Sequence, residues 1–109
     1  MITAFKKRAV NPREYLQVAR KYALKNNYDP NKLSFSDNEK YKLNYDGVDF
    51  GSSRNNDFII YSLLNKRGID TNPQIHRSRY LARSGKIGGD WKNNKLSKNN
   101  LSRRILWNA

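Results

Sequence analysis

The chain has 109 residues, 37% hydrophobic and 12% aromatic, which allows one domain with a modest core of large side chains. Its 22 Lys and Arg against 9 Asp and Glu give a net charge of +13, an imbalance that a polyanionic partner would relieve. The absence of cysteine excludes disulfides and thiolate metal sites, and no apolar run approaches the roughly 18 residues of a membrane span, so we expect a soluble protein.

Positive charge is concentrated towards the two ends of the chain. Residues 1–25 carry seven Lys or Arg and one acidic residue, residues 26–65 carry four and six, and residues 66–109 carry eleven and two. The middle therefore has the composition of a charge-balanced scaffold, and both ends have the composition of surfaces that meet an anion.

The first predicted helix covers residues 12–26. Asn11 suits the N-cap, Pro12 the first helical position and Glu14 the third, and apolar residues then recur at helical spacing. The pattern ends before the turn residues Tyr28-Asp29-Pro30. We expect residues 1–11 to form a basic N-terminal arm.

Alternating apolar and polar residues predict β-strands within residues 33–50. Asp46-Gly47 stands between two such runs, and this dipeptide is a strong hairpin signal because a type I′ turn needs positive φ at both central residues. The expected product is a small antiparallel meander of two or three strands, which needs a helix against one face to be stable.

Two further helices are predicted after the sheet. Asp57 can cap an apolar run that ends before Gly68, which predicts a helix over residues 57–67, although its β-branched pair leaves a strand possible over 58–61. Pro73 then begins a basic helix over residues 73–84.

A basic Gly/Asn-rich loop is expected over residues 85–99, followed by a short helix over 100–107 that is capped near Asn99 or Asn100. Together the elements predict a single α+β domain, residues 1–109, in which a small antiparallel meander packs against several short helices.

Residues with catalytic or metal-binding chemistry are few. His76 is the single histidine and lies among arginines, where a plain surface or contact role is expected. Asp46 and Asp49, with Glu39 nearby, would be the ligands of a metal-dependent nuclease, but the turn and the polar face of a strand already explain both aspartates. We therefore predict no enzyme activity, no catalytic residue, no metal and no cofactor, with the nuclease as a weaker alternative.

Basic side chains of the last predicted helices are the candidate contact residues. Interleaved with Tyr80 and Trp91, they suit phosphate contact and base stacking, but arginine and aromatic residues are equally favoured in protein interfaces. The candidates for binding a partner or nucleic acid are Arg77, Arg79, Arg83, Lys86, Lys92, Lys95, Arg103 and Arg104.

Three stretches resemble a group of small basic proteins of unassigned function in large DNA viruses and some phages: KYKLNYDGVDFGSSRNNDFIIY (40–61), RSRYLARSGKIGGDW (77–91) and LSRRILW (101–107). Those proteins tend to combine a hairpin strand ending in Phe-Gly, a basic helix and a terminal Leu-Ser…Ile-Leu-Trp. Where they often carry Arg-His-Gly, this chain has Arg83-Ser84-Gly85. The resemblance implies a viral or phage origin and a component of the virion.

The apolar residues of the tail have two possible roles. Leu101, Ile105 and Trp107 can lock the tail over the sheet beside Phe50, which is the interpretation we favour, or they can dock on a partner.

The function we expect first is a non-enzymatic virion structural protein, a minor capsid or cement-type component that bridges capsid proteins or the packaged nucleic acid. The alternative is a nucleic-acid-binding protein in genome packaging or regulation. We expect no membrane partner and no small-molecule substrate, and a location in the virion and, during assembly, inside the host cell.

Overall fold

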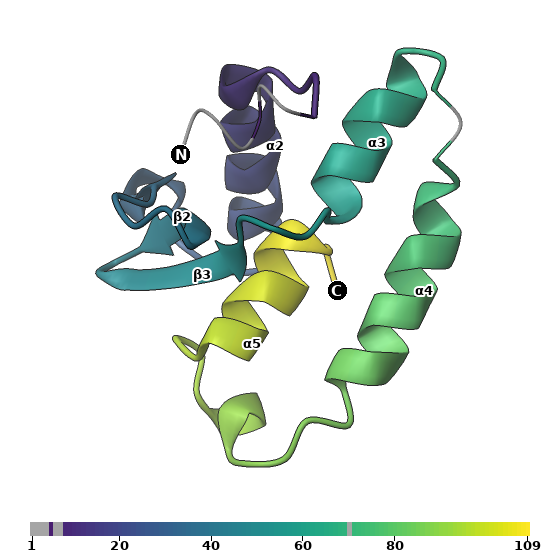
Figure 1. Cartoon of the computed structure of the whole chain (residues 1–109). Helices are drawn as coiled ribbons and strands as arrows, with labels where there is room; N and C mark the ends of the chain where they lie inside the picture. Colours follow the sequence, from purple (N-terminus) through teal and green to yellow (C-terminus); the bar gives the residue numbers. More distant parts are fainter. Residues whose placement is uncertain (1–4, 6–7, 70) are drawn as a thin grey trace.

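The computed structural model describes residues 5, 8–69 and 71–109. It confirms the predicted α+β class, with helices around one three-stranded antiparallel sheet of order β1-β2-β3 (Figure 1). The elements are α2 (Pro12–Lys25), η1 (Pro30–Lys32), β1 (Leu33–Phe35), β2 (Tyr41–Tyr45), β3 (Val48–Ser52), α3 (Phe58–Lys66), α4 (Pro73–Ser84), η2 (Trp91–Asn93), α5 (Lys98–Leu101) and the π-helical turn η3 (Ser102–Leu106).

The β2–β3 hairpin forms at the predicted turn. Asp46 has φ 49° and Gly47 has φ 89°, the positive values that a type I′ turn requires. The turn sets the register, so that Tyr45 faces Val48 and Leu43 faces Phe50 across the hairpin.

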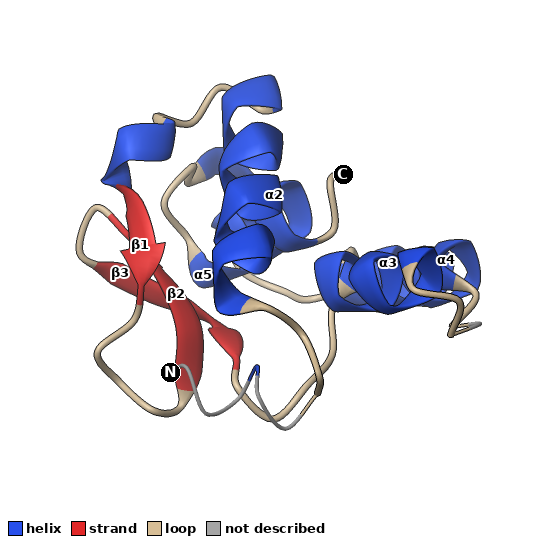
Figure 2. Cartoon of the chain, turned by 90° about the horizontal axis from the view of Figure 1, so that it is seen from above, coloured by secondary structure: helices blue, strands red, loops and turns tan. Residues whose placement is uncertain are grey.

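The elements form three layers. Figures 1 and 2 show the sheet on one side and the α3–α4 pair on the other, with α2 and the α5–η3 segment between them. The contacts agree: α2 packs against β1 and η3, α5 packs against β3, and α3 packs against both α2 and α4. No helix in residues 8–69 or 71–109 has the length and apolar character that crossing a membrane requires.

The tail segment, residues 97–109, packs its apolar side chains into the core of the domain. Leu101 and Ile105 are fully buried, Trp107 is 6% exposed, and all three belong to the same core cluster as Phe50. The Trp107 ring stacks on Tyr80 of α4, with centroids 4.2 Å apart. The apolar residues of the tail are therefore occupied by contacts within the chain.

The start of the tail differs from the expectation. Ser97, rather than Asn99 or Asn100, is the N-cap of α5, and its hydroxyl accepts a hydrogen bond from the Asn100 backbone N–H at 3.2 Å. Asn100 is buried, and its side-chain amide donates to the carbonyl of Asn94 at 2.9 Å. The helix thus begins before the predicted residue 100, because Ser97 caps it, while the Asn99 side chain donates to the Ser84 carbonyl of α4 and that of Asn100 donates to the preceding loop.

Residues 1–4 and 6–7 of the expected basic arm lie outside the described residues. In the described part, Phe5 is fully buried, with its ring centroid 4.5 Å from Tyr15 and 5.6 Å from Phe35. Val10 is also buried. These two apolar residues tie the beginning of the chain to α2 and β1.

Gly51, which follows Phe50 in β3, is needed for close packing of the tail. Its φ is 77°, and a Cβ added there would lie 2.7 Å from Cδ1 of Leu106. Leu106 is itself buried, so it cannot move aside without disturbing the core. Glycine therefore allows η3 to lie directly on the sheet.

Replacing this glycine tests how tightly the tail is packed. We expect Gly51→Ala to lower the free energy of unfolding by about 2–4 kcal/mol, from backbone strain and overpacking together. Gly47→Ala is the matched control, because Gly47 also has positive φ but nothing lies within 4 Å of an added Cβ; it should cost only about 1–2 kcal/mol. Urea unfolding measures both values, and equal losses would mean that Leu106 does not press on Gly51.

Candidate functional site

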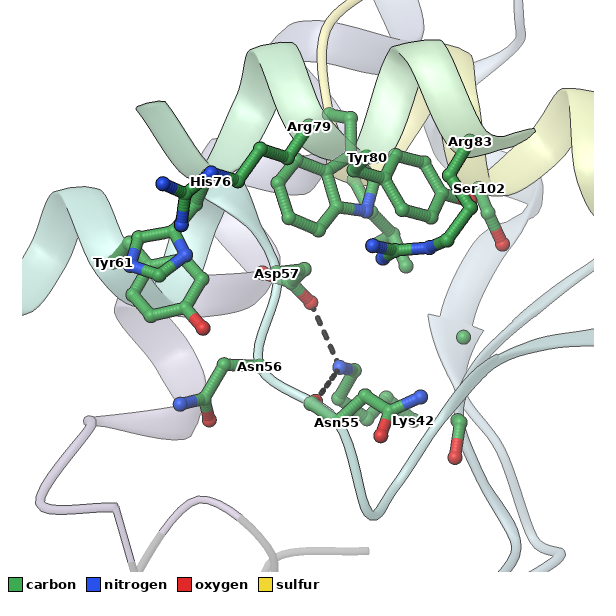
Figure 3. A pocket seen from close by; sticks show the side chains of 14 residues that line it. Lys42, Asn55, Asn56, Asp57, Tyr61, His76, Arg79, Tyr80, Arg83 and Ser102 are labelled. Atoms are coloured by element: carbon green, nitrogen blue, oxygen red, sulfur yellow. Dashed lines mark hydrogen bonds and ion pairs between the residues drawn. The ribbon is translucent and has the colours of Figure 1, made fainter. Parts of the chain in front are cut away.

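A cavity of about 550 Å³ lies between α4, the loop that joins β3 to α3, and the tail segment (Figure 3). We call it the α4 pocket. Its volume is in the range of pockets that hold small ligands. Figure 3 shows Arg79, Tyr80 and Arg83 along one side and Asn55 and Asn56 on the opposite side.

One face of α4 supplies the basic and aromatic side of the pocket. One face of the helix carries His76 and the residues three, four and seven positions after it: Arg79, Tyr80 and Arg83. Both arginines are exposed, and the Arg83 guanidinium carbon lies 5.9 Å from the centroid of Tyr80. The pocket therefore presents two guanidinium groups.

The floor of the pocket is a buried ion pair. Lys42 of β2 and Asp57, the N-cap of α3, are each 1% exposed, and Lys42 Nζ lies 2.9 Å from Asp57 Oδ2. Lys42 Nζ also donates to the carbonyl of Asn55 at 2.6 Å. Asp57 accepts two further hydrogen bonds, from the Tyr15 hydroxyl at 2.5 Å and the Ile60 backbone N–H at 2.9 Å.

This pairing decides the net charge of the pocket. Asp57 is the only acidic residue among the described residues that line it, and its charge is balanced by Lys42. The ion pairs found within the described part of the chain are Lys42–Asp57 and Lys32–Asp46, so neither Arg79 nor Arg83 has a carboxylate partner there. The pocket carries a net charge of about +2 and suits an anion.

Aromatic rings close the pocket at the α4 side. Tyr61 and His76 stack with centroids 3.9 Å apart and an interplanar angle of 7°. Tyr80 and Trp107 stack with an angle of 11°. Figure 3 shows Tyr61 and His76 together at one end of the pocket, with the Tyr61 hydroxyl directed towards its interior.

The predicted contact residues separate into two groups. Arg79 and Arg83 line the pocket, and Lys86 is exposed just beyond the end of α4. Arg77, by contrast, donates to the carbonyls of Trp107 at 2.9 Å and Asn108 at 2.8 Å. Arg103 donates to the carbonyl of Leu81 at 2.9 Å.

The remaining predicted contact residues lie outside the pocket. Lys92 lies over the Trp91 ring at 5.6 Å, and Lys95 lies over the Tyr28 ring at 4.7 Å. Arg104 donates to the carbonyl of Ala109. The structure therefore does not gather all eight residues into one surface.

The aspartates considered for a nuclease are held by local bonds. Asp49 accepts hydrogen bonds from Asn44 at 2.9 Å and Ser36 at 2.7 Å, and these bonds lower the pKa of its carboxyl group. Asp46 lies 4.0 Å from Lys32. In the residues that the structure describes, no group of three or more His, Cys, Asp or Glu is placed to hold a metal.

Sequence reasoning missed the floor of the pocket and its asparagine side. The alternation of Tyr41, Leu43 and Tyr45 with Lys42 predicts a polar face for Lys42, and Asp57 is predicted only as a helix cap. The one available signal was the spacing of His76, Arg79, Tyr80 and Arg83 on α4, which indicates a shared face.

Comparisons with models of protein families, with curated proteins and with solved structures found no match to this chain. The resemblance to small viral proteins therefore stays a prediction.

The buried ion pair should be costly to break. Lys42→Met leaves Asp57 buried without its cation, so we expect the free energy of unfolding to fall by about 3–5 kcal/mol. Lys32→Met is the control, because Lys32 and Asp46 are each about half exposed and their pair should contribute less than about 1 kcal/mol. Denaturant unfolding at neutral pH gives both values. Similar losses would show that the buried pair contributes no more than the surface pair.

Stability should fall at alkaline pH. Burial, followed by the charge and hydrogen bond of Asp57, raises the pKa of Tyr15 well above 10.0, and burial also raises the pKa of Tyr22, Tyr28 and Tyr80. Because each folded pKa exceeds the unfolded value, this stability is fully present below pH 10.0 and is lost as pH rises through the folded values.

Tyr15→Phe isolates the largest part of this effect. It should lower stability near neutral pH by about 1–2 kcal/mol, through loss of the bond to Asp57, and should make the decline above pH 10.0 shallower. Urea unfolding across the alkaline range, with tyrosinate absorbance recorded in parallel, measures both. Parallel stability curves for the two proteins would contradict the assignment to Tyr15.

Proposed function

We propose that this protein binds nucleic acid without catalysing a reaction and that Arg79 and Arg83 are its main phosphate contacts. The observation that supports this most directly is the pair of exposed guanidinium groups on one face of α4, without a carboxylate partner among the described residues. Guanidinium groups bind phosphate oxygens through paired, charge-assisted hydrogen bonds.

The surroundings of these arginines favour a nucleic acid over a simple anion. Tyr61 and His76 lie beside them, and the asparagine amides opposite can both donate and accept hydrogen bonds. Aromatic and amide groups next to arginine suit bases and phosphates of one strand. Residues 66–109 contribute eleven cations in all, which supports long-range attraction to a polyanion.

Burial of the tail is why we rank nucleic-acid binding before a capsid role. A capsid cement protein would hold its partner partly through aromatic and aliphatic anchors at the centre of the interface. Leu101, Ile105 and Trp107 are buried within the domain and are not available for this purpose.

The virion structural role, which the sequence alone placed first, is our second proposal. It is favoured by three isoleucines in or near α4 that are about half exposed: Ile69 at 50%, Ile75 at 44% and Ile87 at 53%. Apolar side chains at these positions suit a protein surface better than a phosphate backbone. The viral setting itself rests on the sequence resemblance.

Salt dependence tests the first proposal. Affinity for a labelled single-stranded oligonucleotide, measured by fluorescence anisotropy, should fall linearly on a log–log plot as salt rises. The double variant Arg79→Gln/Arg83→Gln should weaken binding and reduce the slope by about 1.4, because each lost phosphate contact on a single strand accounts for about 0.7.

The control for this experiment is Arg13→Gln/Lys21→Gln, which removes the same charge from exposed positions on α2. It should change affinity much less than the α4 variant. Equal effects would mean that net charge, rather than the α4 face, drives binding. Absence of salt-dependent binding, together with capture of an acidic protein surface, would place the capsid role first.

The proposal also includes the absence of strand cleavage. Pure protein incubated with labelled DNA and Mg²⁺ or Mn²⁺ should leave the strands intact, because Asp49 is engaged by Asn44 and Ser36. Gel electrophoresis checks this. Cleavage that disappears in Asp49→Ala would reverse the proposal in favour of a nuclease.

A further inference from the structure

We infer that the α4 pocket holds a nucleotide that carries a phosphate monoester, as found at the phosphorylated end of a single strand or in a free nucleoside monophosphate. This inference rests on the proposed function and deepens it by assigning the pocket to one unit of the strand. Three features support it: the charge of the pocket, the burial of its floor and the groups around its rim.

The charge of the pocket matches a monoester better than a phosphate within a strand. A monoester carries about −1.5 to −2 at neutral pH, whereas a backbone phosphate carries a single charge. Arg79 and Arg83 supply two positive charges, and Lys42 adds none because it is neutralised by Asp57. The terminal phosphate also has three free oxygens, enough for both guanidinium groups.

The floor of the pocket suits a chain end. It is formed by groups that belong to the core: Asp57 and Lys42 are 1% exposed, Leu106 is 2% exposed and Trp107 is 6% exposed. A strand therefore cannot continue through this side of the pocket. A unit at the end of a strand can enter without the rest of the chain having to follow.

The rim offers groups for the sugar and base. Asn55 and Asn56 are exposed on the side opposite α4, and Figure 3 shows both at the pocket with Tyr61 and His76 at one end. These side chains provide donors and acceptors that a bare phosphate would not use. The cavity of about 550 Å³ is also larger than a phosphate requires.

Trp107 provides a direct reporter of occupancy, because it lines the pocket. The chain has two tryptophans, so Trp91→Phe leaves Trp107 as the only one. In this background, the fluorescence of Trp107 is titrated with a nucleoside 5′-monophosphate, with inorganic phosphate, and with one oligonucleotide in 5′-phosphorylated, 3′-phosphorylated and unphosphorylated forms.

We expect the monophosphate and a phosphorylated oligonucleotide to change Trp107 fluorescence and inorganic phosphate to act much more weakly. The preferred phosphorylated form should bind about tenfold more tightly than the unphosphorylated one, the scale of one hydrogen bond to a charged group. Tighter binding of the oligonucleotide than of the monophosphate identifies a strand end as the ligand, and the reverse identifies a free nucleotide.

Arg83→Gln in the same background should abolish the preference for the phosphorylated form. Arg83 is exposed, and among the described residues its guanidinium lies over the Tyr80 ring without an ion pair, so the variant should stay folded, which circular dichroism verifies. Arg79→Gln should act in the same direction, and Arg13→Gln on α2 should keep the preference.

The outcomes separate this inference from the proposed function. Salt-dependent binding of all oligonucleotides, without preference for a terminal phosphate and without a Trp107 response, overturns the inference and leaves the proposed function standing. A monophosphate response without any oligonucleotide binding overturns the proposed function alone. An equal response to inorganic phosphate overturns the assignment of a nucleotide, and the absence of any binding, by fluorescence and by anisotropy, overturns both.

Discussion

The buried ion pair between Lys42 and Asp57 is the constraint on which the rest of the structure depends. It joins β2 to the beginning of α3, and the Tyr15 hydroxyl extends it to α2. Two buried charges are tolerated only when every polar atom around them has a partner, and within the described residues no buried side-chain nitrogen or oxygen lacks one. Since Asp57 also caps α3, the same carboxylate fixes where that helix starts.

The Lys42–Asp57 ion pair also sets where α4 lies. Once α3 is anchored at Asp57, α4 returns beside it, and the face with Arg79 and Arg83 is brought opposite Asn55, whose carbonyl the lysine holds. The pocket is thus a consequence of the ion pair. The pair provides its floor and removes the charge of the only acidic residue described there, which leaves the arginines of α4 to set its sign.

Arginines have two distinct uses in this protein, and α4 shows both. Near its C-terminal end, Arg103 donates to the carbonyl of Leu81, which also accepts the backbone N–H of Gly85 at 3.0 Å, and a cationic group is favourable at a helix C-terminus. Arg77 of α4 in turn donates to two carbonyls of the tail, those of Trp107 and Asn108. Arginine thus joins α4 to the tail on one face, while Arg79 and Arg83 on the other face are exposed at the pocket. These hydrogen bonds hold α4 and the tail together in a domain whose apolar core is small.

Local signals in the sequence predicted most of the fold but little of the site. Asn11, Asp57 and Asp46-Gly47 act on their own neighbours, so caps and hairpin could be found from a few adjacent residues. The burial of Lys42 could not be found in this way, because it depends on the carboxylate of Asp57, fifteen positions away, which also caps α3.

The tail illustrates the same limit. Its apolar spacing indicates a helix, but not the π-helical turn, in which the Trp107 N–H bonds to the Ser102 carbonyl at 3.2 Å. Nor does the spacing show that Leu106 of this turn packs closely on Gly51. For the same reason, the separate uses of Arg77 and Arg79, two residues apart on one helix, appear only when the tail is in place.

Formation of the pocket and completion of the fold are therefore linked. Ser102, Leu106 and Trp107 of the tail line the pocket, so the pocket exists only when the tail is docked. A ligand that binds only this form stabilises it in proportion to the logarithm of ligand concentration over Kd. The tail also places a cationic group, Arg103, at the C-terminal end of α4 and shares a core cluster with Phe50. Leu106 and Trp107 thus complete both the core and the pocket. Leu101 and Ile105 are buried in the same core cluster, in a tail whose other residues, apart from Ala109, are Ser, Asn, Lys and Arg.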